Sequence, residues 1–321
     1  MRYVLLPSIA LGLACLTVTS AYAQAWPSKP IRWIVPFGPG SSDVLMRSLI
    51  PAVGAALGQP ILVENRPGAS GSIGTEQVAK SPPDGYTLLL GAAATHAVNP
   101  ALIKLNYDPV RDFAPVINLA SIPNVVIVHP QLAVRSIAEL VAAAKAKPET
   151  LTYSSNGSGS SAHMSAALFE MATGAKMVHV PHKGSSEAVL AVVRGDVNIM
   201  FANLPPAQPL IKDGRLRPIA VTTAQRLASM PELPTVAEGG VPGFEVATWF
   251  ALFAPAGTPD AIVQRLNREF GAALANAETR ARLVQLGFII NGGSPQDLGA
   301  LVKNDLTRWA RVVRETGAKA E

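Results

Sequence analysis

Two segments rich in glycine and serine have the composition of an anion-binding site. The first is Gly38-Pro39-Gly40-Ser41-Ser42-Asp43, and the second is Ser154-Ser155-Asn156-Gly157-Ser158-Gly159-Ser160-Ser161. Each follows a strand-like run and opens a helix-like run, and a helix start offers unpaired N–H groups and the positive end of its dipole. Glycine lets the backbone approach an anion closely, and serine adds hydroxyl donors. One such segment alone is as well explained by ordinary helix capping, but the pair favours a ligand held from both sides.

Motifs for nucleotide binding and for serine catalysis are missing from the sequence. There is no G-x-x-x-x-G-K-[ST] and no G-x-G-x-x-G after a strand, and Gly68-Ala69-Ser70-Gly71-Ser72 lacks the last glycine of G-x-S-x-G. His179 and His182 have the spacing of a metal pair, but Pro181 lies between them and no carboxylate is close. We therefore expect neither a metal nor a cofactor.

Four further polar residues each allow two interpretations. His96 and His163 lie beside a strand end and a helix start, where a histidine can line a cleft or pack against its neighbours. Lys183 follows a strand and could attract an anion or be a solvated turn residue. Asp43 is an acid in a first helical turn, which the helix dipole favours, and it could also accept a hydrogen bond from a ligand.

The N-terminus has the pattern of an export signal. Arg2 precedes an apolar stretch over residues 4–20, and Ala21-Tyr22-Ala23 fits a cleavage site that would start the mature chain near Gln24. A short membrane anchor is the alternative, but no stop-transfer pattern follows. The single cysteine, Cys15, falls inside this segment, so the mature chain would have no disulfide and no thiol chemistry. We expect an exported protein.

Composition argues against disordered, membrane-inserted and nucleic-acid-binding proteins. Of 321 residues, 49% are apolar and 15% are charged, which supports a large core and excludes disorder. No later run approaches the roughly 20 apolar residues of a spanning helix, so we expect no membrane insertion of the mature chain. The net charge of +5 is spread along the chain without a basic and aromatic patch, which weakly favours small anions and does not indicate nucleic acid.

The elements around the two Gly/Ser segments alternate between strand and helix patterns, which predicts parallel α/β sheets. Predicted strands cover residues 31–36, 61–64, 86–90, 125–128, 151–154, 177–180, 197–201 and 219–222. Predicted helices cover residues 44–57, 72–80, 137–147, 162–173 and 186–194. The chain after residue 259 is predicted to be helical, without a sheet of its own, so it must pack on one of the two α/β blocks. With 1–23 as signal peptide, we expect lobe one over 24–123 plus 252–321, and lobe two over 124–251.

Short motifs in a fixed order carry a family resemblance. They include Trp26-Pro27-x-Lys29-Pro30-Ile31-Arg32, Val35-Pro36-Phe37-x-Pro39-Gly40, Glu64-Asn65-Arg66-Pro67-Gly68, Pro83-Asp84-Gly85-Tyr86-Thr87, His179-Val180-Pro181 and Ala254-Pro255-Ala256-Gly257-Thr258-Pro259. In these motifs the chain resembles the Bug-type receptors, which are periplasmic solute-binding proteins of tripartite tricarboxylate transporters. The resemblance covers essentially the whole mature chain.

The resemblance implies an α/β, two-lobed periplasmic binding protein fold of type II-like form. Each lobe would be a mostly parallel sheet flanked by helices, with the ligand cleft between the lobes. In the family, the loops after the first and third strands and the Gly/Ser loop of the second lobe hold a carboxylate ligand. Carried over to this chain, and joined with the residues above, the candidate ligand-binding residues are Phe37, Pro39, Gly40, Ser41, Ser42, Asp43, Ala93, Thr95, His96, Ser154, Ser155, Gly157, Ser158, Gly159, Ser160, His163, Lys183 and Asn203.

The chain departs from the family pattern at three places that the resemblance implies face the ligand. Gly38-Pro39-Gly40-Ser41 replaces Pro-Pro-Gly-Gly, His182 replaces a tyrosine, and Ala202 replaces an acid beside Asn203. The substrate of a relative therefore does not transfer to this chain. Loss of a cleft acid would suit a ligand without an amine.

The predicted function is a non-catalytic receptor. We expect it to capture a small carboxylate or dicarboxylate as a monomer, close over it by a hinge, and deliver it to membrane permease subunits. One alternative is a receptor that signals to a regulatory partner. Another is a secreted hydrolase or isomerase that uses serine or histidine in the same cleft.

Overall fold

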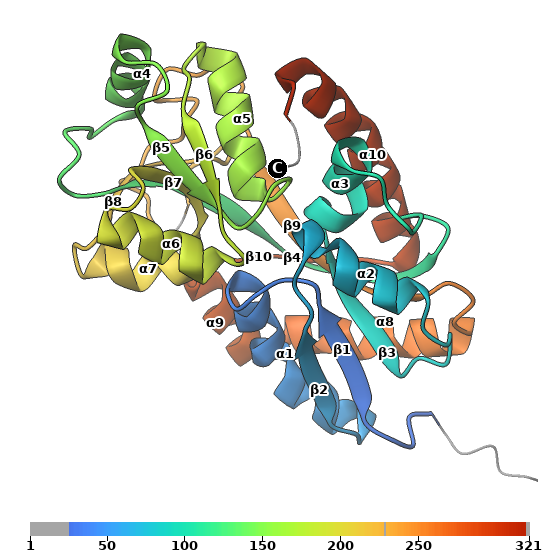
Figure 1. Ribbon diagram of the computed structural model, residues 1–321. Coiled ribbons are helices and arrows are strands. Elements are labelled where there is room, and N and C mark those ends of the chain that lie inside the picture. Colours follow the sequence, from blue (N-terminus) through green and yellow to red (C-terminus); the bar gives the residue numbers. More distant parts are fainter. Residues whose placement is uncertain (1–25, 228, 319–321) are drawn as a thin grey trace, which may run out of the picture.

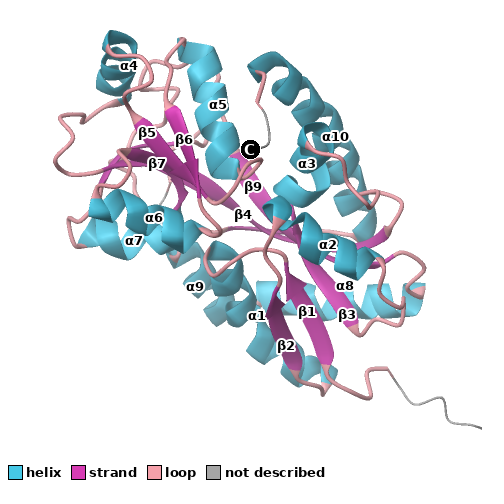
Figure 2. Ribbon diagram, viewed as in Figure 1, coloured by secondary structure: helices cyan, strands magenta, loops and turns pink. Residues whose placement is uncertain are grey.

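The structure is a computed structural model that describes residues 26–227 and 229–318 (Figure 1). The expected signal peptide over residues 1–23 lies outside the described residues. Helices flank strands throughout, and the strands form two sheet regions joined by two long strands (Figure 2). Within the described ranges, no helix combines the length and apolar composition that a membrane crossing requires.

The first half contains a parallel arrangement of three strands. β1 (Ile31–Val35) lies between β2 (Ile61–Asn65) and β3 (Thr87–Ala92). The β3 residues are all buried, as expected for a strand covered by helices on both faces. The helical elements of this half are α1 (Ser41–Leu57), η1 (Ala69–Gly71), α2 (Ser72–Ala79), the π-helical turn η2 (Ala94–Val98) and α3 (Asn99–Leu102).

The second half repeats this design. β5 (Thr152–Ser155) pairs in parallel with β6 (Val178–Pro181) and β7 (Ile199–Asn203). β8 (Arg217–Val221) pairs with the long strand that enters this half. The helices here are α4 (Ile137–Ala146), α5 (Ser161–Thr173), α6 (Ser185–Arg194) and α7 (Leu204–Lys212).

Two antiparallel strands connect the halves. β4 (Phe113–Val128) pairs with β9 (Ala247–Pro255) up to Pro123, and from Asn124 onward it pairs with β7. The prediction of mostly parallel sheets is therefore right for the outer strands and wrong for the centre. The physical reason is the chain path: β4 carries the chain out of the first half and β9 carries it back, so the two run in opposite directions.

The pairing of these strands bears on the division into lobes, which stays a prediction. The switch of β4 partners falls between Pro123 and Asn124, at the predicted first boundary. Ala247 pairs with Pro123, and Phe250 with both β3 and β4. If lobes are assigned by strand pairing, the second boundary moves from 251/252 to 246/247.

The C-terminal part differs from the purely helical tail that the sequence predicts. Between α8 (Asp260–Ala275), α9 (Ala277–Gln285) and α10 (Pro295–Thr316) lies a strand, β10 (Ile289–Gly292), which pairs with β4. The prediction that the tail packs on one block is also wrong, because α10 is about 33 Å long and reaches both. Its Leu298 belongs to an apolar cluster of the first half, and its Trp309 to a cluster made mostly of second-half residues, where α10 contacts α5.

Candidate functional site

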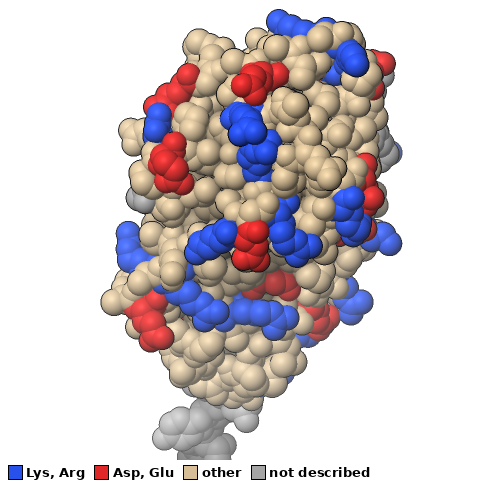
Figure 3. All heavy atoms as spheres, turned by 90° about the vertical axis from the view of Figure 1, so that its left-hand side faces the viewer, with Lys and Arg blue, Asp and Glu red and all other residues tan. Residues whose placement is uncertain are grey.

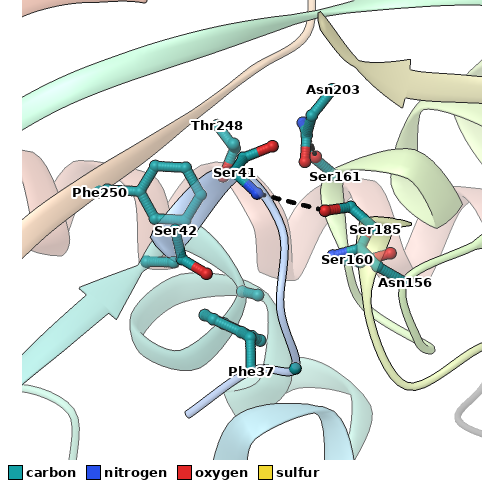
Figure 4. A pocket seen from close by; sticks show the side chains of 13 residues that line it. Phe37, Ser41, Ser42, Asn156, Ser160, Ser161, Ser185, Asn203, Thr248 and Phe250 are labelled. Atoms are coloured by element: carbon teal, nitrogen blue, oxygen red, sulfur yellow. Dashed lines mark hydrogen bonds between the residues drawn. The ribbon is translucent and has the colours of Figure 1, made fainter. Parts of the chain in front are cut away.

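A small cavity lies between the two halves, where helices of both begin (Figure 4). Its volume is about 30 Å³, enough for one or two water molecules or for a group of carboxylate size. The residues that line it are Phe37, Gly38, Ser41, Ser42, Ala92, Ala94, Asn156, Ser160, Ser161, Ser185, Asn203, Thr248 and Phe250. Five of the predicted site residues are among them: Phe37, Ser41, Ser42, Ser160 and Asn203.

Four helices of the described chain start at this cavity. Ser41 and Ser185 are the first residues of α1 and α6, and Ser160 and Asn203 are the N-caps of α5 and α7. Each helix start contributes unpaired N–H groups and a partial positive charge. None of the thirteen lining residues is charged. The local field at the cavity therefore comes from helix ends and favours an anion.

One face of the molecule carries surface charges of both signs. On the face shown in Figure 3, Lys and Arg side chains are interspersed with Asp and Glu. Surface charges of mixed sign partly cancel and are screened by salt within about 10 Å. This face therefore gives no strong preference for an anion, in contrast to the helix starts at the cavity.

The first loop is held open by hydrogen bonds of its own half. Asp43 Oδ2 accepts from the Gly40 N–H at 3.2 Å and from Asn65 Nδ2 at 3.3 Å. Asn65 Nδ2 also donates to the Phe37 carbonyl at 2.9 Å. The Asp43 carboxylate is thus used to shape the loop and cap α1, and it does not line the cavity.

Ser41 is the most informative residue of the site. It is 2% exposed, and its Oγ has no hydrogen-bond partner among the described residues. Its N–H donates to Ser185 Oγ, at 3.3 Å, across the boundary between the halves (Figure 4). A buried hydroxyl without a partner costs free energy, and the cavity is the space in which a ligand can satisfy it.

A buried polar network positions Asn203. Its Nδ2 donates to Asn124 Oδ1 at 2.7 Å, and Ser161 Oγ reaches the same oxygen at 3.3 Å. Asn124 is fully buried and donates in turn to Ser165 Oγ at 2.9 Å. Asn124 therefore connects the end of β7 to the start of α5 below the cavity.

Close backbone contact between the halves encloses the cavity. A Cβ added at Gly184 would lie 3.1 Å from the Pro39 carbonyl oxygen, and one at Gly38 would lie 3.0 Å from the Lys183 carbonyl oxygen. A Cβ added at Gly40 would meet Ser185 Oγ. Glycine allows this close approach of the two loops, whereas a larger residue at position 38 or 184 would crowd the backbone of the facing loop.

Sequence reasoning missed Ser185, although a signal for it existed. The tripeptide Gly-Ser-Ser occurs at 40–42, 159–161 and 184–186, and each copy stands at the start of a helix. The prediction used the first two copies; at the third it included Lys183 as a candidate ligand-binding residue but not Ser185. Asn156 and Ser161 lie within the predicted segment 154–161 but were not among the individual candidate residues. Thr248 and Phe250 were missed altogether; they come from β9, whose approach to the cavity depends on its pairing with β3 and β4.

Several predicted residues lie behind the cavity in the first half. Ala93 belongs to an apolar cluster, and Thr95 Oγ1 hydrogen-bonds the backbone of Ala92. His96 is fully buried, stacks on Phe253 with ring centroids 4.0 Å apart, and has its Nδ1 2.9 Å from Thr95 Oγ1. The structure thus places Thr95 and His96 as packing residues beneath the cavity wall.

The remaining predicted residues of the second half support its Gly/Ser loop. Ser154 Oγ donates to the Ala188 carbonyl, and Ser155 Oγ lies 2.6 Å from His179 Nε2. His163 Nδ1 accepts from the Gly159 N–H at 2.9 Å, and the His163 ring stacks on His179. These contacts hold the backbone of the loop, while Gly157, Ser158 and Lys183 line a separate, larger cavity.

Two further observations concern a possible metal site and the position of Ala202. No group of three or more His, Cys, Asp or Glu side chains within the described residues could hold a metal ion. Ala202, where the family has an acid, is fully buried in an apolar cluster with Val125 and Met200. Its side chain packs in the core, away from the lining of the cavity.

Burial of His96 predicts a dependence of stability on pH. Burial lowers the pKa of His96 to about 3, whereas the unfolded value is near 6.5. Between these values the unfolded chain binds the proton and the folded chain does not, so the free energy of unfolding falls as the pH falls. At pH 5 this loss amounts to roughly 2 kcal/mol relative to pH 7.5.

The variant His96→Phe keeps an aromatic ring and removes the titration. Urea unfolding at pH 7.5 and 5.0 should therefore show a smaller acid loss in the variant than in the parent protein. Other groups, such as His179 with its pKa lowered to about 4 by burial and by His182, act in both proteins and cancel. Equal acid losses in the two proteins would show that His96 is accessible to protons in the folded state.

The fold and site together define a class of protein. Two α/β halves joined by two long strands enclose a polar cavity at the starts of helices, and this is the architecture of periplasmic solute-binding proteins. The predicted α/β periplasmic binding fold is therefore confirmed.

Comparison with known proteins identifies the family. Residues 45–318 match the family described as "Tripartite tricarboxylate transporter family receptor", and the chain belongs to this family. Protein BugT of Bordetella pertussis is 39% identical over 300 residues, which cover 92% of this chain and 92% of BugT. The predicted membership among Bug-type receptors is confirmed.

Two relatives have solved structures with a bound acid. The R. palustris protein Rpa4515 with adipate is 39% identical, has a TM-score of 0.89, and is matched over 92% of this chain and 99% of its own. MatC from Rhodopseudomonas palustris with bound malate is 32% identical, has a TM-score of 0.85, and is matched over 90% and 100%.

Proposed function

We propose that this protein is a periplasmic receptor that binds a small organic acid between its halves and delivers it to a tripartite tricarboxylate-type permease. The observation that carries the proposal is the uncharged cavity at which four helices start. A carboxylate placed there would accept hydrogen bonds from helix-start amides and from the Ser41 hydroxyl. The descriptions of two relatives as bound to adipate and malate support the choice of a carboxylate.

Enclosure of the cavity supports a mechanism of closure on the ligand. Ser41 belongs to the first half and Ser185 to the second, and they meet at the cavity. Only the closed arrangement brings the helix starts of both halves to one carboxylate. A ligand therefore shifts the population toward the closed form by the difference in its affinity for the two forms.

The lining of the cavity supports binding without catalysis. A hydrolase needs a nucleophile within hydrogen-bond reach of a base, with a third group to orient the base. The described lining residues include five serines and a threonine but no histidine, lysine or carboxylate. We propose that bound acids are released unchanged, and that the receptor acts as a monomer.

A thermal-shift screen tests the proposal. The mature chain, from Gln24 onward, would be screened against mono-, di- and tricarboxylates, with amino acids as a separate group. Binding to the native state raises the melting temperature by mass action. Recovery of the bound acid unchanged supports a receptor, whereas turnover supports an enzyme. Loss of uptake of that acid in cells lacking the protein would support the permease partnership, and intact uptake with a lost transcriptional response would contradict it.

Replacement of one hydroxyl tests the site itself. We expect Ser41→Ala to weaken binding of the acid found in the screen by about tenfold, because one donor to the carboxylate is lost. The melting temperature without ligand should not fall, since the hydroxyl has no partner among the described residues. Ser48→Ala on the same helix is the control, because that hydroxyl donates to the Val44 carbonyl at 2.8 Å. Unchanged affinity in Ser41→Ala would remove this residue from the site.

A further inference from the structure

A second and larger cavity lies between the halves beside the first. Its volume is about 370 Å³, and it shares Phe37 and Asn156 with the small cavity. One wall is the loop over residues 67–71, and the facing walls are residues 156–158 and 181–183. The two cavities are thus neighbours with a common boundary at Phe37.

The sizes of the two cavities indicate which part of a ligand each could hold. The small cavity, at about 30 Å³, accepts little more than one carboxylate. The larger one falls within the range of about 300–1,000 Å³ that is typical of small-molecule sites. The body of any ligand anchored in the small cavity would therefore lie in the larger one.

Lys183 is the only lysine, arginine or carboxylate among the described residues that line the larger cavity. Lys183 lines it and has no ion-pair partner among the described residues. His182 also lines it; its Nδ1 lies 3.6 Å from Glu187 Oε1, and its Nε2 is buried without a hydrogen-bond partner in the described chain. No carboxylate is among the described residues that line this cavity. This composition suits a second acidic group.

The loop that forms the opposite wall, residues 67–71, has a strained backbone conformation. Four successive residues have positive φ: Gly68 at 135°, Ala69 at 44°, Ser70 at 54° and Gly71 at 89°. Such strain in residues other than glycine persists only where surrounding contacts enforce it, and it concentrates at ligand-binding sites. Here Asn99 Nδ2 donates to the Ser70 carbonyl at 2.9 Å. A Cβ at Gly71 would come within 2.9 Å of the Phe37 ring, so this loop also fixes the ring at the boundary.

We propose that the larger cavity is a subsite for a second acidic group of an elongated ligand, and that Lys183 is the residue that selects it. This inference rests on the proposed function, because it takes the first carboxylate to lie in the small cavity. The apolar chain of the ligand would pass along Phe37. The Lys183 ammonium would then pair with the distal acid, and His182 Nε2 would be the neighbouring polar partner.

Two probes of equal chain length separate this inference from the proposed function. Hexanoate and adipate differ only in the second carboxylate, and calorimetry would give the dissociation constant of each. The parent protein should bind adipate at least about tenfold more tightly than hexanoate. Lys183→Gln should weaken adipate binding by about tenfold and change hexanoate binding by less than about twofold.

Lys176→Gln is the matched control, since it removes an equal charge from an exposed residue of the same half. Its affinities for both probes should equal those of the parent protein. An equal loss for both probes in Lys183→Gln, or no loss for either, would overturn the role of Lys183. Tight hexanoate binding without preference for adipate would overturn the second subsite alone. Failure of the parent protein to bind either acid would overturn the carboxylate site together with it.

Discussion

Gly184→Val should abolish tight ligand binding while leaving the protein folded. The added Cβ would lie 3.1 Å from the Pro39 carbonyl oxygen and 3.3 Å from the Gly38 carbonyl carbon, and valine adds two methyl groups to this crowded contact. Backbone atoms cannot rotate out of the way, so the two halves could not reach the closed arrangement. We expect a loss of affinity of about a hundredfold or more, because only the closed form brings the helix starts of both halves to the ligand.

The backbone at residue 184 tolerates valine in other respects. Its φ of −163° and ψ of 163° are extended, a conformation that β-branched residues favour. The loss of glycine at the N-cap of α6 costs about 1 kcal/mol, which shifts the melting temperature by only a few degrees.

Calorimetry with the acid found in the screen measures the affinity, and small-angle scattering measures whether the ligand still compacts the protein. Gly299→Ala is the control, because its added carbon would meet only the Pro115 side chain, at 3.8 Å. Parent-like affinity in Gly184→Val would show that the contact between the loops is not needed for binding.

Asn124→Ala should have the largest combined effect on stability and binding. The substitution leaves the Asn203 amide without its acceptor at 2.7 Å and Ser165 Oγ without the Asn124 donor at 2.9 Å, in a region where Asn124 is fully buried. Unsatisfied buried groups together with the space left behind should lower the free energy of unfolding by about 2–4 kcal/mol. Affinity should fall by about tenfold, since Asn203 would no longer be held at the cavity.

Urea unfolding and calorimetry on the same variant measure the two effects. Asn291→Ala on β10 is the control, because its hydrogen bonds to Asn118 and Ser121 are exposed and should contribute less than about 1 kcal/mol. If Asn124→Ala does not fold, Ser165→Ala removes one branch of the same network with less disruption. An unfolding free energy within about 1 kcal/mol of the parent would show that the network does not hold this part of the core.

Local patterns in the sequence determined the elements and the chemical character of the site. Apolar runs between turn signals predicted β1, β2 and β3, and the two Gly/Ser segments predicted the helices that begin at Ser41 and Ser161. These signals are reliable because strand propensity and helix capping depend on neighbouring residues. The same segments, which contain no arginine, indicated an anion held by backbone N–H groups and hydroxyls.

Tertiary structure decided which of these residues meet. The antiparallel course of β4 and β9 follows from the chain crossing between the halves twice, and it brings Thr248 and Phe250 to the cavity. The contact of Gly184 with Pro39, the link from Asn203 to Asn124, and the burial of His96 on Phe253 join residues from 79 to 157 positions apart. No local pattern encodes such pairs, because they arise only when distant segments pack in three dimensions. The sequence thus determined the donors that could bind an acid, and the packing of the two halves decided which donors surround the cavity.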